Sequence, residues 1–250
     1  MTSLPTSDSS AGPVTWAIDI GGSHLKSLLL DPSGGTIGRP VRVETPDRPT
    51  PGAVLAGLRG LALELGSFDR ISVGFPGVLR HGRVLTAPNL DNESWRNFSL
   101  AAALWERFDR PARVMNDATV QGFGVIGFRG IECVITLGTG MGFALFQDGR
   151  PSVHLELAHH PLRKRKTYED YVGRDALDDV GTKKWNRRVR RVIDSIERLV
   201  CYDMLYIGGG NASHLVPDFP ANVRIVDNEA GMWGGIHLWD PAMDPYFAVI

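Results

Sequence analysis

Three glycine-rich segments each follow an apolar run, and their residue types suit the binding of phosphate. The segments are Gly21-Gly22-Ser23, Gly138-Thr139-Gly140 and Gly208-Gly209-Gly210. Glycine lets backbone N–H groups approach a ligand closely and point at it together, which matches phosphate oxygens. None of the segments has the Walker or the Rossmann spacing, and a tight turn would explain any one of them alone. Three such turns at strand ends favour a phosphate-binding cleft between two lobes, because Ser23 and Thr139 add hydroxyls and Lys26 adds a cation.

A lone acidic residue, Asp117, follows the apolar run at 112–115, separated from it only by Asn116. We predict that this run is a buried strand, so that Asp117 lies at its carboxyl end, where α/β proteins place ligand-binding groups. Capping of a following helix at 118–126 is an equally good explanation, because Asn and Asp are both favoured helix caps. In a phosphate-lined cleft, the same carboxylate would act as a general base that accepts a proton from a hydroxyl.

Positive charge is concentrated in two short stretches of the sequence. The first is residues 163–166, and the second lies on a predicted amphipathic helix at 182–200. Side chains spaced three and four apart share one face of that helix: Lys184, Arg187, Arg188 and Arg191, with Lys183 beside them. A solvated helix face is the usual explanation of such a charge run. Because the whole chain has a net charge of −1, this local excess would favour a long polyanion. We predict a track for polyphosphate here, although nucleic acid would gain from the same charges as well.

The composition is that of an ordinary globular protein. The 250 residues are 43% hydrophobic and 22% charged, enough for one large domain or two small ones. The near-zero net charge gives no overall attraction to nucleic acid or anionic lipid, so we expect neither as a partner. Cys133 and Cys201 lie in apolar segments and are expected to be buried free thiols. Residues 1–13 lack signal-peptide features and no apolar run reaches membrane-spanning length, so we expect a disordered tail and a cytoplasmic location.

Predicted strands and helices alternate along the chain, which favours an α/β fold. Two segments, at 15–35 and 132–151, share the plan of strand, small-residue turn, strand and turn. This weak internal repeat suggests two lobes of similar topology. Leucines at helical spacing predict a helix at 50–66, with Thr50 as its N-cap. We expect three parts: the tail at 1–13, a small lobe at 14–115 onto which a segment at about 238–250 packs back, and a larger lobe at 116–237.

An ordered set of short motifs resembles the ROK family of sugar kinases and related regulators, and within it the polyphosphate glucokinases. The motifs include DIGGSHLK, TPDRPTPGAV, VGFPGV, APNLDNESW, NDA, LGTGMGFALFQDG, ELAHHP, YEDY, KKWNRRV, YIGGGNAS and NEAGMWGG. They stand in family order and cover nearly the whole chain after the tail. The resemblance implies a two-lobed actin-like (ribonuclease H-like) α/β fold with an active-site cleft between the lobes, and a homodimer.

The resemblance also implies a function and roles for particular residues. The chain would transfer a phosphoryl group from polyphosphate or ATP, accompanied by Mg²⁺, to the 6-hydroxyl of glucose. Asp117 would be the catalytic base, and Asp19 would help to organise Mg²⁺ and phosphate. The sugar hydroxyls would be held by Asn89, Asn116, Glu156, His159 and Glu169. The phosphates would be bound by Asp19, Gly21, Gly22, Ser23, Lys26, Gly138, Thr139, Gly140, Gly208, Gly209 and Gly210.

The sequence departs from the family pattern at several points. No cysteine follows the ELAHHP motif, where many members carry a zinc site, so no zinc is expected. Ala158 stands where the family has a glycine, and a positive φ there would strain it. Thr119 begins the run TVQG, where the polyphosphate enzymes have an acidic residue and small residues.

Three alternative functions remain open. The first is a kinase for another hexose, such as mannose, fructose or an N-acetylated sugar. The second is a transcriptional regulator. This alternative is disfavoured because the repressors of the family carry an N-terminal helix-turn-helix segment, whereas only 13 residues precede the first predicted strand here. The third is a non-catalytic sugar sensor, against which the retained Asp117 and glycine turns argue.

Overall fold

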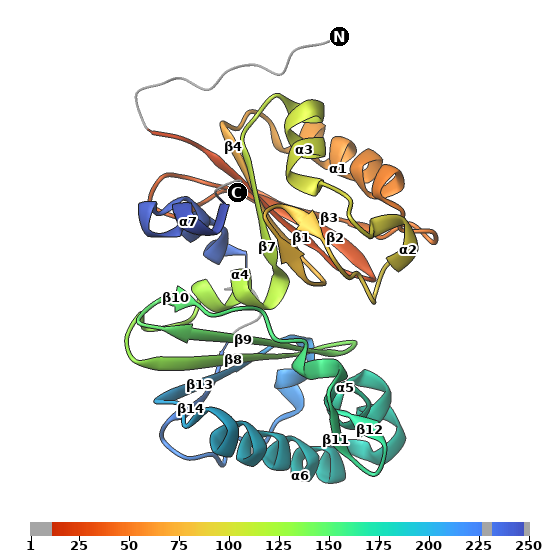
Figure 1. Cartoon of the computed structure of the whole chain (residues 1–250), viewed down its shortest axis with the longest axis vertical. Coiled ribbons are helices and arrows are strands. Elements are labelled where there is room, and N and C mark those ends of the chain that lie inside the picture. Colours follow the sequence, from red (N-terminus) through yellow and green to blue (C-terminus); the bar gives the residue numbers. More distant parts are fainter. Residues whose placement is uncertain (1–11, 227–231, 248–250) are drawn as a thin grey trace. The chain divides into compact units, whose positions relative to one another are not determined.

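The computed structural model describes residues 12–226 and 232–247, which form two compact units (Figure 1). The first unit contains 12–124 and 232–247, and the second contains 125–226. The predicted lobes were divided after residue 115 and at about residue 238. The observed division differs, because α4 (Asp117–Phe123) and η4 (Trp233–Trp239) pack against each other within the first unit. Apart from residues 12 and 13, the predicted tail lies outside the described residues.

The first unit is built on a five-stranded sheet with the order β3-β2-β1-β4-β7. β1 and β2 form an antiparallel hairpin that continues into β3, whereas β4 and β7 run parallel to β1. Parallel strands end at the same edge of a sheet, so the glycine turn after β1 and Asp117 after β7 lie at one edge. The strands are β1 (Thr15–Ile20), β2 (His24–Leu30), β3 (Thr36–Glu44), β4 (Arg70–Phe75) and β7 (Ala112–Asn116).

Two helices cover this sheet and hold its core. α1 packs on β2 and β3, and α3 packs on β7. α1 begins as predicted, because Thr50 Oγ1 accepts a hydrogen bond from the backbone of Ala53 at 3.4 Å. The two helices are α1 (Pro51–Leu65) and α3 (Leu100–Phe108). The other elements of the unit are short: β5 (Leu79–Arg80), β6 (Arg83–Val84), α2 (Asn92–Trp95), η5 (Pro241–Met243) and α7 (Asp244–Phe247).

The second unit repeats the hairpin-plus-parallel plan, with the sheet order β10-β9-β8-β13-β14. β8 and β9 are antiparallel around the turn at 138–140, and β13 runs parallel to β8. The predicted internal repeat is therefore confirmed, because β1 and β8 each pair with an antiparallel partner and a parallel one. The elements are β8 (Ile131–Leu137), β9 (Met141–Gln147), β10 (Arg150–Pro151), η1 (Leu157–His159), β11 (Pro161–Arg163), β12 (Lys166–Thr167), α5 (Tyr168–Val172), α6 (Arg174–Val200), β13 (Met204–Gly208), η2 (Gly210–His214) and β14 (Val223–Ile225).

The long helix α6 is interrupted at Gly181, whose φ of 70° and ψ of 160° are not helical. The segment after this break is the helix predicted at 182–200, and its apolar face is buried at Trp185, Val189, Val192 and Ile196. Leu199 was expected on the same face, but its side chain is 60% exposed. No helix among the described residues combines the length and the apolar character needed to cross a bilayer.

The two cysteines differ in their environment. Cys133 is buried in β8, as predicted. The prediction for Cys201 was wrong, because this residue is exposed. It follows α6 with a φ of 53°, a left-handed conformation that ends the helix at the surface instead of continuing its buried face.

Candidate active site

The carboxylate of Asp117 is fixed at the junction of β7 and α4. Asn116 is the helix cap, because its Oδ1 accepts a hydrogen bond from the backbone of Thr119 at 3.2 Å. Its amide Nδ2 donates to Asp117 Oδ1 at 3.0 Å and to Gly77 O at 3.3 Å. Asp117 Oδ1 also accepts from the backbone N–H of Ala118 at 2.7 Å. Since Asn116 supplies the cap, capping does not account for the side chain of Asp117, which is held in one orientation at the strand's end.

The first glycine turn is tied to the neighbouring strands. Gly21 N donates to His24 O at 2.9 Å and closes the turn between β1 and β2. Thr45 Oγ1 donates to Gly21 O at 2.6 Å, and its backbone N–H donates to Ser23 O at 3.0 Å. The turn is therefore held by three hydrogen bonds before any ligand arrives, which lowers the ordering cost of binding.

Asp19 and Lys26 are paired residues of the β1–β2 hairpin and form an ion pair, with Lys26 Nζ 3.5 Å from Asp19 Oδ2. Burial raises the pKa of the Asp19 carboxyl, and the charge and hydrogen bond of Lys26 partly offset that effect. Lys26 is 39% exposed at its side chain, so its charge remains within reach of an incoming anion. The pair combines a carboxylate that a cation would stabilise with an ammonium group that a phosphate would stabilise.

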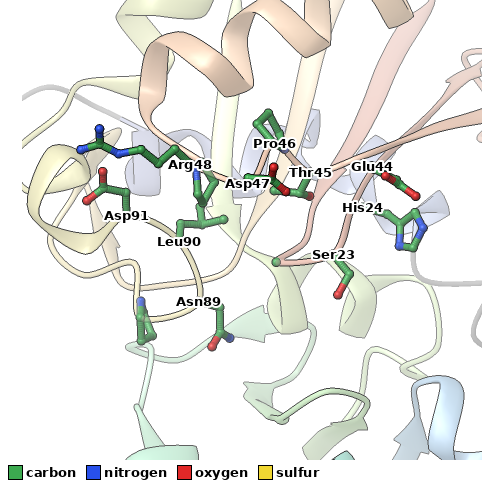
Figure 2. A pocket seen from close by; sticks show the side chains of 13 residues that line it. Ser23, His24, Glu44, Thr45, Pro46, Asp47, Arg48, Asn89, Leu90 and Asp91 are labelled. Carbon is green, nitrogen blue, oxygen red and sulfur yellow. The ribbon is translucent and has the colours of Figure 1, made fainter.

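A polar pocket of about 850 Å³ lies in the first unit beside this turn (Figure 2). Gly22, Ser23 and Asn89, all predicted site residues, line it together. Asn89 lies close to the turn, since a Cβ placed on Gly22 would lie 3.1 Å from Asn89 O. The lining also includes charged or polar side chains that the sequence reasoning did not assign: His24, Glu44, Thr45, Asp47, Arg48 and Asp91. Thr45, Asp47 and Arg48 belong to the TPDRPTPGAV motif, and that motif could have indicated from the sequence that they line the pocket.

The other two glycine turns contact each other in the second unit. Asn211 Nδ2 donates to Gly138 O at 2.7 Å, which links the turn after β8 to the segment after β13. Gly209 has a φ of 89°, and an added Cβ would collide with the backbone of Leu137. Glu169, predicted to hold a sugar hydroxyl, packs its carboxylate against Gly140. The backbone of these two contacting turns is therefore closely packed, and their conformation is fixed by contacts within the chain.

The predicted sugar ligands Glu156 and His159 lie close together, since Glu156 directly precedes η1 and His159 is its last residue. His159 Nε2 is 3.7 Å from Glu156 Oε2, and His154 Nε2 is 3.3 Å from Glu156 Oε1. The hydrogen bond from His154 lowers the pKa of Glu156, assisted by the attraction of both imidazoles and opposed by burial. Ala158 is not among the described residues with a positive φ, so the expected strain there is absent. His154 was missed by the sequence reasoning.

Both basic stretches of the sequence meet in one groove of about 440 Å³ in the second unit. We call this the basic groove. It is lined by Arg163, Lys164, Lys166, Tyr171, Lys184, Arg187, Arg188 and Arg191. Lys183 does not line it, and Arg190 instead pairs with Asp218 at 3.2 Å. The predicted track on α6 is therefore one wall of the groove, and the hairpin of β11 and β12 supplies another.

Tyr171 organises two arginines of the basic groove. Arg191 Nη1 donates to Tyr171 Oη at 2.8 Å, and the Arg188 guanidinium lies 5.0 Å from the centre of the Tyr171 ring. Across the groove, Lys164 and Arg165 have φ values of 51° and 63°, an unfavourable conformation for residues with long side chains. The hairpin thus keeps a strained two-residue turn that carries positive charge at its tip.

Comparison with known proteins identifies the family of the chain. Residues 15–163 match the sequence pattern of the ROK family. The chain belongs to the ROK family. The polyphosphate glucokinase of Mycobacterium tuberculosis is 29% identical to it over 235 residues, which are 88% of each chain. That of Mycobacterium leprae is 29% identical over 236 residues, which are 88% of this chain and 72% of the relative.

Solved structures of ROK proteins have the same fold. The inorganic polyphosphate/ATP-glucomannokinase of Arthrobacter sp. strain KM is 30% identical, with a TM-score of 0.82 over 90% of this chain and 98% of its own. A ROK family glucokinase from Streptomyces griseus, solved with glucose and AMPPNP, is 19% identical, with a TM-score of 0.74 over 90% and 98%. These structures confirm the predicted two-lobed, actin-like α/β fold.

Proposed function

We propose that this chain is a sugar kinase that transfers a phosphoryl group from polyphosphate or ATP to the 6-hydroxyl of glucose. One observation carries the proposal: Asp117 is held by Asn116 and Ala118 at the end of β7, in a chain that matches polyphosphate glucokinases over 88% of its length. A carboxylate fixed in this way suits proton abstraction, because its orientation is settled before the substrate binds.

In the proposed reaction, Asp117 accepts the proton of the sugar hydroxyl as its oxygen closes on the transferred phosphorus. General-base assistance of this kind contributes roughly 10²–10⁴-fold to the rate. Asn89 and Asn116 in the first unit, and Glu156, His159 and Glu169 in the second, hold the remaining hydroxyls. They offer both hydrogen-bond donors and acceptors, as recognition of a sugar requires.

The phosphates of the donor are proposed to bind at the glycine turns. Turns of this kind point backbone N–H groups at phosphate oxygens, and Lys26 adds a positive charge next to the first turn. Mg²⁺ usually binds proteins through one or two carboxylates together with substrate phosphates and water. The Asp19 carboxylate fits that donor set, whereas the part of the chain that the structure describes assembles no group of three metal-ligating side chains. Mg²⁺ bound with the donor would stabilise charge on its phosphates.

Polyphosphate is the donor that the basic groove supports. Seven cationic side chains and one tyrosine line the groove, and no carboxylate is among them. A polymer with charge on every phosphate gains from several of these cations at once, whereas a single nucleotide reaches only a few. The relative from Arthrobacter is a polyphosphate/ATP-glucomannokinase, so mannose and ATP belong in the same test. We also propose a cytoplasmic homodimer, with no nucleic-acid or membrane partner.

The test is a panel of hexoses against ATP and against long-chain polyphosphate, with the phosphorylated sugar identified by mass spectrometry and NMR. We expect glucose 6-phosphate from polyphosphate. Another hexose as the preferred acceptor would correct the substrate, and activity with ATP alone would remove polyphosphate as donor. Hexose binding without turnover for either donor would identify a sugar sensor instead.

A further inference from the structure

His154 occupies an inward position in a loop whose apolar residues face outward. In the segment between β10 and η1, Val153 is 78% exposed and Leu155 is 40% exposed, whereas the side chain of His154 is only 14% exposed. Apolar side chains are more often buried than histidine, so a buried imidazole between two exposed apolar side chains is the opposite of the usual arrangement. An interaction of the imidazole must therefore favour this arrangement.

That interaction is with the carboxylate of Glu156. His154 Nε2 lies 3.3 Å from Glu156 Oε1, while Nδ1 is buried and has no hydrogen-bond partner in the described part of the chain. A carboxylate accepts hydrogen bonds, so in this pair Nε2 of His154 is the donor. The other oxygen of Glu156 faces His159 Nε2 at 3.7 Å. Glu156 is thus flanked by two imidazoles, one at each oxygen.

We propose that His154 is a positioning residue for Glu156 and fixes its carboxylate for the acceptance of sugar hydroxyls. This inference rests on the proposed function, in which Glu156 contacts the sugar. Glu156 is 32% exposed at its side chain, so without a partner it would sample several rotamers in water. A carboxylate fixed before binding loses less conformational entropy when a hydroxyl pair docks on it. His154 acts through Glu156 and does not itself contact the sugar.

The experiment compares His154→Leu, which removes the donor, with His154→Gln, whose amide N–H can occupy the place of the imidazole Nε2–H. Val153→Ala is the matched control in the same loop. For each variant, the hexose KM and kcat, the donor KM and the equilibrium Kd of the hexose without donor are measured. We expect His154→Leu to raise the hexose KM and Kd about 10-fold, the effect of losing a hydrogen bond to a charged group. The kcat and the donor KM change less than about 3-fold, the pattern for loss of uniform substrate binding.

We expect His154→Gln to restore hexose affinity to within about 3-fold of the wild type and Val153→Ala to leave it unchanged. Equal losses in the leucine and glutamine variants, or an unchanged Kd in His154→Leu, overturn the proposal. Failure of the proposed function looks different, since the wild type would then bind or phosphorylate no hexose. In that case, ¹⁵N NMR of the imidazoles still decides: an Nε2–H tautomer of His154 supports the pairing with Glu156, and an Nδ1–H tautomer contradicts it.

Discussion

The basic groove leads to a prediction that separates the two possible donors. Lys184 and Arg187 lie one helical turn apart on α6, and both line the groove. Replacing both with alanine removes two of its seven cations while leaving Tyr171 and its two arginine partners in place. We expect the double variant to bind long-chain polyphosphate more weakly and to keep its affinity for ATP.

The magnitude follows from the exposure of the two side chains. Both are solvent-exposed, so each contact with a phosphate about 4 Å away is worth about 1 kcal/mol. Loss of both costs about 2 kcal/mol, which is a ~30-fold rise in the KM for polyphosphate. The effect should shrink as salt is raised, because counterions screen exposed charges. The assay is initial-rate kinetics with each donor at two salt concentrations and saturating hexose.

Two residues of the same helix provide the control. Lys183 and Arg190 carry the same charges but do not line the groove, and Arg190 is held by Asp218. The double variant Lys183→Ala/Arg190→Ala changes the net charge by the same amount. It should leave the KM for polyphosphate within about 3-fold of the wild type. Equal effects of the two double variants, or equal effects on both donors, would refute the reasoning, because net charge and not the groove would then be responsible.

Three further predictions concern stability. Asn116→Ala should lower the free energy of unfolding by about 1–2 kcal/mol in urea titrations, since it removes the cap of α4; an unchanged midpoint would contradict the assignment of the cap. Gly209→Ala should destabilise the chain by at least about 1 kcal/mol, because its φ is 89° and the backbone of Leu137 blocks a Cβ, and differential scanning calorimetry would detect the loss; an unchanged melting temperature would count against this. The lowered pKa of Glu156 contributes stability that is present above its ordinary value of 4.5 and lost as the pH falls through the folded value, so Glu156→Gln should flatten the acid-side decline in urea stability; parallel pH curves would contradict it.

Local patterns in the sequence predicted those parts of the fold that neighbouring residues determine. The two hairpins around 21–23 and 138–140 were predicted because glycine turns between apolar runs leave few alternatives. The cap at Thr50 and the apolar face of α6 follow equally local rules. The boundary between the units was misplaced, because the packing of α4 against η4 depends on residues more than 100 positions apart.

The candidate site was predictable in its motifs but not in its supporting contacts. A single histidine between two apolar residues has no signal in sequence, so His154 appeared only through its distance to Glu156. The hairpin that carries Lys164 joins the basic groove through tertiary structure, although its charge run was visible. Lys183 was included in the track by proximity in sequence alone, and the groove leaves it out. Long-range packing decides the case of the hairpin, whereas the contact of His154 with Glu156 spans only two positions and depends on the conformation of the loop.

The central claim is that the carboxylate held at the end of β7 accepts the proton of the attacking hydroxyl. The most direct measurement is the single-turnover rate of Asp117→Asn with polyphosphate and glucose, alongside the Kd of glucose. The account predicts a rate lower by roughly 10²–10⁴-fold with a glucose Kd within about 3-fold of the wild type. A rate near that of the wild type would contradict the account.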